Sequence, residues 1–182
     1  MNNFFIIFLL LSLGVTAQAT VEKKFEPCLL LTNSEIQVVQ GQAPAQTIAS
    51  EQPSGTFRFT QCYFRTPEFS SSVSVALGLP LAADSKRFGP RQYWQKQFHP
   101  QVKAVPGRKK KEPPKPITGL GDEAFWVGDP KTGALYVLKG EFFLRVSVGG
   151  PGDQTEKIKR ARVLASHALK RLNASGPNPG KR

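Results

Sequence analysis

The stretch ALYVLKGEFFLRVSV, residues 134–148, decides the fold class of this chain. It holds two β-prone runs joined by Gly140 and Glu141, and a two-residue link that begins with glycine is typical of a type II′ hairpin turn. The second run alternates, which places Leu144, Val146 and Val148 on one face and Phe143, Arg145 and Ser147 on the other. The stretch therefore predicts an antiparallel hairpin.

A long amphipathic helix follows this hairpin. The sequence GGPG, residues 149–152, ends the second strand, and Asp153 is a suitable N-cap for the helix. From about Gln154 to Leu172, apolar residues recur at i, i+3 and i+4 spacing: Ile158, Ala161, Leu164, Ala165, Ala168, Leu169 and Leu172. Such a stripe has to be buried, so we expect the helix to pack on the hairpin.

A short helix is predicted near the N-terminal end of the domain. Thr32 and Glu35 have the spacing of a capping box, in which each side chain bonds the backbone N–H of the other. Gly41 stands where a glycine in the left-handed conformation commonly ends a helix. We therefore expect a helix over residues 33–40.

The central part of the chain predicts a second hairpin and a third helix. Residues 42–55, rich in Gln, Ala, Ser and Pro, predict a loop, whereas residues 57–64 and 72–77 predict two strands of a loose hairpin. Residues 84–98 predict a helix, and residues 119–127 include a short strand. The aromatic residues of the helix fall on one stripe, which we interpret as core packing: Tyr93, Trp94 and Phe98.

These elements predict a single α+β domain. We expect an antiparallel sheet of about five strands with helices packed on one face. The domain spans residues 20–172 and includes a basic, Pro-rich loop over residues 99–118, which has no helical or strand periodicity. Residues 173–182 contain two Pro and two Gly and predict a flexible tail.

The N-terminus predicts export. Residues 1–19 contain an apolar run of the length of a signal-peptide core, too short to span a membrane as a mature helix. Ala17, Gln18 and Ala19 form a small-x-small cleavage site, so we expect a periplasmic or secreted protein that begins at Thr20. The leader has no Lys or Arg, which leaves an uncleaved N-terminal anchor as the alternative.

The cysteine count agrees with export. Cys28 and Cys62 are the only cysteines, and an oxidising compartment favours a disulfide between them. The alternative is a catalytic cysteine with a histidine partner, although neither cysteine lies in a nucleophile motif. The two cysteines and two histidines have no metal-ligand spacing.

The net charge of +12 is concentrated in two segments. Residues 157–172 contain six basic residues and no acid, and we expect these to form a solvated face opposite the apolar stripe. Residues 103–115 carry a net charge of +5 among prolines. This segment supplies the candidate anion-binding residues: Arg108, Lys109, Lys110, Lys111 and Lys115.

No catalytic motif is recognisable. Asp122 and Glu123 are adjacent, so on a strand they would point to opposite faces, and we interpret Asp122 as a turn-capping residue. His99 and His167 have no acid or nucleophile nearby in the sequence, and we expect His167 on the exposed side of the last helix. The glycine patterns match neither a nucleotide-binding loop nor a nucleophile elbow. We therefore assign no catalytic residue, cofactor or metal.

A set of short motifs resembles an uncharacterised family of exported bacterial α+β domains, many of them lipoproteins and often actinobacterial. The motifs are PCLLLT at residues 27–32, Cys62 at the end of a strand, GLGDEAF at residues 119–125, and LRVSV at residues 144–148 before the amphipathic helix. The resemblance implies a small domain with its cysteine pair bridged, and no catalytic residues. This chain lacks the lipobox of a lipoprotein and carries the additional basic loop.

The leading hypothesis is an exported, non-enzymatic domain that binds an anionic polymer, membrane headgroups or another anionic partner through the basic loop. The loop has no aromatic residue on which bases could stack, which argues against sequence-specific nucleic-acid recognition. One alternative is a protein-binding scaffold domain of the cell envelope. The other is a hydrolase of unrecognised type, which would need Asp122, Glu123 and His99 to converge in one pocket. The sequence leaves the oligomeric state open.

Overall fold

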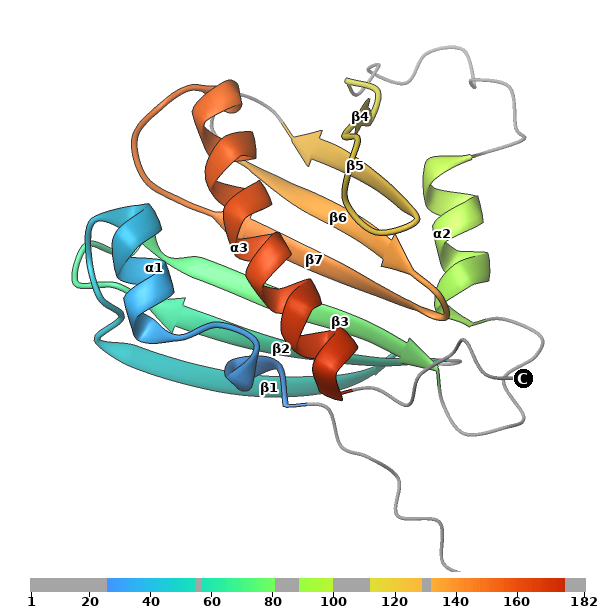
Figure 1. The fold of residues 1–182 in the computed structure, drawn as a ribbon, viewed down its shortest axis with the longest axis horizontal. Helices are drawn as coiled ribbons and strands as arrows, with labels where there is room; N and C mark the ends of the chain where they lie inside the picture. Colours follow the sequence, from blue (N-terminus) through green and yellow to red (C-terminus); the bar gives the residue numbers. More distant parts are fainter. Residues whose placement is uncertain (1–25, 55–56, 81–88, 100–111, 129–131, 176–182) are drawn as a thin grey trace, which may run out of the picture.

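A single antiparallel sheet organises the molecule (Figure 1). The computed structural model describes residues 26–54, 57–80, 89–99, 112–128 and 132–175. The elements are η1 (Pro27–Leu29), α1 (Asn33–Gln40), β1 (Gln46–Ser54), β2 (Phe57–Arg65), η2 (Phe69–Ser71), β3 (Val73–Pro80), α2 (Pro90–Phe98), β4 (Lys115–Pro116), β5 (Glu123–Gly128), β6 (Gly133–Lys139), β7 (Phe142–Val148) and α3 (Gln154–Ser175). The strand order is β1-β2-β3-β7-β6-β5-β4.

The predicted α+β class and antiparallel sheet are confirmed. The two predicted hairpins are β2–β3 and β6–β7, and they join through β3 and β7, where Val75 lies opposite Val146. Gly140 has a φ of 56°, as the first position of a type II′ turn requires, and Glu141 follows with a negative φ. Pairing between hairpins that are distant in sequence therefore makes one continuous sheet.

The sheet has seven strands rather than about five. The additional strands are the two edges, β1 and β4. β1 lies within residues 42–55, which we predicted to be a loop, and it pairs with β2 over its full length. β4 lies within the predicted loop over residues 99–118 and pairs with Trp126 and Phe125 of β5. Backbone pairing suffices for an edge strand, so neither needs the alternating apolar pattern of a central strand.

One face of the sheet is covered by α1 and α3, which cross it on the near side in Figure 1. The predicted capping box of α1 is present, and Gly41 ends this helix with a φ of 76°. Asp153 caps α3, because its carboxylate accepts a hydrogen bond from the backbone N–H of Glu156. The apolar residues of both helices are buried against the strands: Ile36, Ala161, Leu164, Ala165, Ala168, Leu169 and Leu172 against Val75, Leu77, Leu135, Val137, Leu144 and Val146.

The prediction that the helices pack on one face is wrong, because α2 covers part of the opposite face. Its residues Trp94 and Phe98 pack with Phe57, Leu138 and Phe143 in a separate core cluster. Phe143 neighbours Leu144 in β7 and therefore points to the other side of the sheet. Large apolar side chains on both sides of these strands require cover on both faces.

The ends of the chain differ partly from expectation. α3 continues to Ser175, beyond the predicted end at Leu172. The predicted signal peptide over residues 1–19 and the last part of the predicted tail, residues 176–182, lie outside the described residues. Within the described ranges, no helix is both long and apolar enough to cross a membrane.

Candidate functional site

The predicted disulfide is present. Cys28 of η1 and Cys62 of β2 are bonded, with Cα atoms 5.0 Å apart. Cys62 is fully buried in the core beneath α1 and α3. The bond fastens the start of the domain to the middle of a strand, and both cysteines have a structural role.

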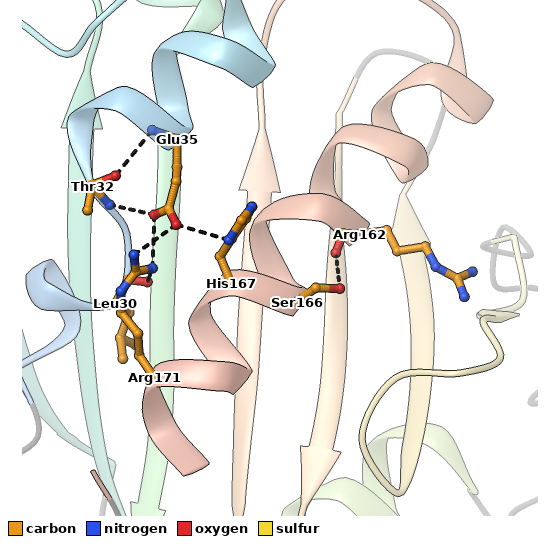
Figure 2. Close-up of polar contacts among 7 residues, drawn as sticks. All are labelled: Leu30, Thr32, Glu35, Arg162, Ser166, His167 and Arg171. Atoms are coloured by element: carbon orange, nitrogen blue, oxygen red, sulfur yellow. Dashed lines mark hydrogen bonds and ion pairs between the residues drawn. The ribbon is translucent and has the colours of Figure 1, made fainter. Parts of the chain in front are cut away.

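A second link joins the start of the domain to its end. The carboxylate of Glu35 in α1 accepts hydrogen bonds from both Nη atoms of Arg171 in α3, at 2.9 and 2.8 Å (Figure 2). It also accepts the backbone N–H of Thr32 at 2.8 Å and lies 2.9 Å from Nδ1 of His167. Arg171 additionally donates to the backbone carbonyl of Leu30. We call Glu35, Arg171 and His167 the helix clasp.

The helix clasp keeps Glu35 ionised. Burial of the carboxylate acts to raise its pKa, but the hydrogen bonds from Arg171 and the backbone of Thr32, with the positive charges of Arg171 and His167, outweigh burial. Together they lower the pKa of Glu35 from 4.5 to about 2. His167, which we expected on the exposed side of the last helix, is half-exposed and paired with this acid.

We expect Glu35→Gln to destabilise the protein at neutral pH by about 2–3 kcal/mol, because the folded pKa of Glu35 lies below its unfolded value. This contribution is fully present above the unfolded pKa of 4.5 and is lost as pH falls toward about 2. Urea unfolding at several pH values should therefore show wild type and variant converging in acid. Glu141→Gln, at an exposed turn, serves as the control, and a difference that does not depend on pH would contradict this assignment.

The other arginines of α3 also hold the fold together. Arg160 donates to the Gln40 side chain at 2.9 Å and to the Pro151 carbonyl at 2.6 Å. Arg162 donates to the Thr118 carbonyl at 2.7 Å. The expectation of a solvated basic face is therefore wrong for these positions: their side chains tie α3 to α1, to the turn before α3 and to the segment between β4 and β5.

On the opposite face, a second acid is held at the C-terminal end of α2. Glu123 of β5 accepts the indole N–H of Trp94 at 2.5 Å and lies 2.9 Å from Nε2 of His99. Partial burial acts to raise the pKa of Glu123, but the hydrogen bonds from His99 and Trp94 outweigh it and lower the pKa. This cluster therefore fixes α2 on the sheet.

The three residues that a hydrolase would need do not all converge. Asp122 accepts the backbone N–H of Gly140 at 2.7 Å and the ammonium of Lys139 at 3.1 Å, so it caps the β6–β7 turn. The hydrogen bond from Gly140 lowers the pKa of Asp122. Only Glu123 and His99 are in contact, and among the described residues no hydroxyl or thiol side chain is hydrogen-bonded to His99.

One concave feature of the described part of the chain is a groove on the sheet face opposite α3. It has a volume of about 560 Å³, within the usual range for small-ligand sites. We call it the outer groove. Its lining comes from the ends of β5, β6 and β7, from η2 and from the turn before α3: it includes Ser70, Val127, Tyr136, Arg145, Ser147 and the backbone of Gly149 and Gly150.

Arg145 is the charged residue of this lining. Its Nε donates to the hydroxyl of Tyr136 at 3.2 Å, and its guanidinium carbon lies 5.8 Å from the centre of the Tyr136 ring. Among the described residues it has no acidic partner, and its Nη atoms make no hydrogen bond. Ser147, two residues on and on the same face, donates to the Gly133 carbonyl. Within the described part of the chain, the groove thus presents a positioned guanidinium whose Nη donors have no hydrogen-bond partner.

The predicted anion-binding residues lie largely beyond what the structure describes. Arg108, Lys109, Lys110 and Lys111 are outside the described residues, whereas Lys115 is exposed on β4. Arg145 was missed as a site residue, although the alternation of its strand places it on the same face as Phe143 and Ser147. Within the described ranges, no group of three or more His, Cys, Asp or Glu residues could hold a metal ion.

Comparisons with known proteins do not assign the chain to a family. No family model matches it, and no curated protein gives a significant match. Among solved structures, the extracellular domain of PknH from Mycobacterium tuberculosis aligns over 79% of this chain and 94% of that domain, with 14% identity and a TM-score of 0.43. These values do not establish a common fold. The resemblance to exported bacterial domains and the lipoprotein trait of that family therefore stay predictions.

Proposed function

We propose that this chain is an exported, non-enzymatic domain that binds an anionic ligand in the outer groove. The observation that carries the proposal is Arg145, a half-buried guanidinium with no acidic partner among the described residues, in a groove of about 560 Å³. Arginine presents its N–H donors in a planar fork that matches carboxylate, phosphate and sulfate groups. The hydrogen bond to Tyr136 fixes one edge of the guanidinium and leaves the other for a ligand.

Two further features support export. The Cys28–Cys62 disulfide suits an oxidising compartment, where such bonds persist. The leader over residues 1–19 has the composition of a signal peptide, with cleavage proposed before Thr20. We accordingly propose a periplasmic or secreted location.

The basic loop would add long-range attraction. Residues 103–115 carry a net charge of +5, and one end of this segment lies on β4, where Lys115 is exposed. Charge clusters of one sign raise the encounter rate with anionic partners in a salt-dependent way. In this division of roles, Arg145 determines affinity at short range and Arg108 to Lys111 assist capture.

The proposed ligand is a polymer or surface that presents oxyanions, and three probes distinguish its sources. Poly-glutamate presents carboxylates, heparin presents sulfates, and vesicles with anionic headgroups present phosphates. Binding that resists high salt, with an envelope protein as the partner captured, would favour the scaffold alternative instead. Turnover of an ester or amide substrate that is lost in Glu123→Gln would favour the hydrolase alternative.

We expect Arg145→Gln to weaken binding of the preferred probe by about 10–100-fold, because a charge-assisted hydrogen bond at a half-buried site contributes about 1.5–3 kcal/mol. The matched control is Arg65→Gln, which removes one positive charge at the exposed end of β2, outside the groove. Neutralising the residues from Arg108 to Lys111 should mainly reduce the dependence of probe binding on salt concentration. Titrations of the probe at low and moderate salt measure the affinity of all three variants. Equal affinities for the Arg145 and Arg65 variants would contradict the proposal.

A further inference from the structure

The two edges of the sheet are built differently. β4, at one edge, has two residues, Lys115 and Pro116. Short length, lysine and proline are the devices by which proteins keep a sheet edge from pairing with another strand. β1, at the other edge, has nine residues and pairs with β2 in unbroken register. It has no lysine, and its proline, Pro53, is next to its end.

We infer that β1 pairs with β1 of a second copy of this chain, so that two sheets join into one. This inference is independent of the proposed ligand site. Among the described residues β1 is paired on one side only, so its outward backbone N–H and C=O groups line a long edge, which another strand satisfies best. Antiparallel pairing of the same strand from two copies is self-complementary and closes into a two-fold dimer.

Exposed apolar side chains flank this edge. Ile48 of β1 is 43% exposed, and it lies opposite Tyr63 of β2, whose ring contacts Phe69, 69% exposed. Leu29 of η1, which packs against β1, is 72% exposed. Two of the five large exposed hydrophobic residues in the described part of the chain, Leu29 and Ile48, therefore lie on β1 or on the element packed against it, and Phe69 lies one strand further in, against Tyr63. A partner that covers the edge would also cover this apolar surface.

The charge distribution favours a second copy as the occupant. Residues 26–80, which include β1, contain four acidic and two basic residues, whereas residues 81–182 contain 21 basic and eight acidic residues. On β1 itself the single charge is Glu51, which faces Arg58 at 3.9 Å. Two copies that meet at β1 therefore bring together a strand whose one charge already faces an opposite charge, which keeps like-charge repulsion at this contact small.

The test is the mass of the protein in solution, measured by sedimentation equilibrium over a wide range of concentrations. We expect a reversible dimer. The double variant Ile48→Lys with Ser50→Lys places like charges on the edge of both copies and should raise the dissociation constant at least about tenfold. The matched control, Val163→Lys, changes an exposed apolar residue of α3 and should leave the dimer intact. Arg145→Gln should also remain dimeric, which separates this inference from the ligand site.

Hydrogen exchange keeps the inference testable if the double variant folds poorly. In wild-type protein, the outward-facing amides of β1 should exchange more slowly as concentration rises, while those of the β6–β7 turn should not change. A monomer at every concentration, a dimer that survives the double variant in folded form, or exchange in β1 that is independent of concentration would each overturn the inference.

Discussion

Loss of the Cys28–Cys62 disulfide should lower the free energy of unfolding by about 3–4 kcal/mol. The bond closes a loop with a sequence separation of 34, and the chain-entropy model assigns a value of this size to such a loop. The bond also fastens η1 to a fully buried position of β2, so its loss should loosen the start of the domain. Urea unfolding of the oxidised protein, the reduced protein and Cys28→Ala with Cys62→Ala measures the effect.

The double variant is its own control for the reducing agent. Reduction should destabilise wild type and leave the double variant unchanged, because the chain has no other cysteine. Thiol titration of the denatured, unreduced protein should detect no free thiol. Two titratable thiols, or a reduced protein as stable as the oxidised one, would refute the bridge and remove a main support for export.

Trp94→Ala should destabilise the protein by about 3–5 kcal/mol, which is the usual cost of truncating a large buried aromatic residue. Trp94 is fully buried between α2 and the sheet, and its ring contacts Phe98, Phe125 and Phe143. Its indole also donates to Glu123. The truncation would therefore leave both a cavity and a carboxylate with one donor fewer.

Trp94→Phe separates these two contributions. Phenylalanine keeps most of the ring packing and loses the hydrogen bond, so we expect a smaller loss of about 1–2 kcal/mol. Urea unfolding gives the totals, and hydrogen exchange should show faster opening of α2 than of α3 in both variants. A Trp94→Ala protein as stable as wild type would contradict the assignment of α2 to a core of its own.

The parts of the fold that the sequence predicts correctly are those fixed by neighbouring residues. The capping box of Thr32 and Glu35, the glycine-first turn at Gly140 and the stripe of α3 each depend on spacings of a few residues. β1 escaped prediction because an edge strand is held by backbone bonds to β2 and its side chains are exposed, so Gln, Ser and Ala are tolerated there. The cover of the opposite sheet face by α2 escaped prediction because Phe143, whose side chain points to that face, was not assigned a packing partner.

The contacts of the helix clasp were less predictable because they are long-range. Glu35 and Arg171 are separated by 136 residues, and neither their pairing nor the role of His167 is visible in local spacing. The sequence predicts one solvated basic surface on α3, whereas Arg160, Arg162 and Arg171 bond specific carbonyls and side chains. Arg145 could have been recognised as a candidate because it lies on a central strand, where neither face of the sheet is necessarily open to solvent.

The most direct test of the ligand site is the NMR signal of the Arg145 Nε–H group during titration with a short poly-glutamate peptide, heparin fragments or a soluble phospholipid headgroup. For the probe that binds, we expect this signal and the backbone amides of Ser147, Gly149 and Gly150 to shift together and to saturate. The same probe should leave these amides unchanged in Arg145→Gln. Saturable shifts confined to residues 103–115, with the Arg145 signal unmoved, would contradict a ligand site in the outer groove.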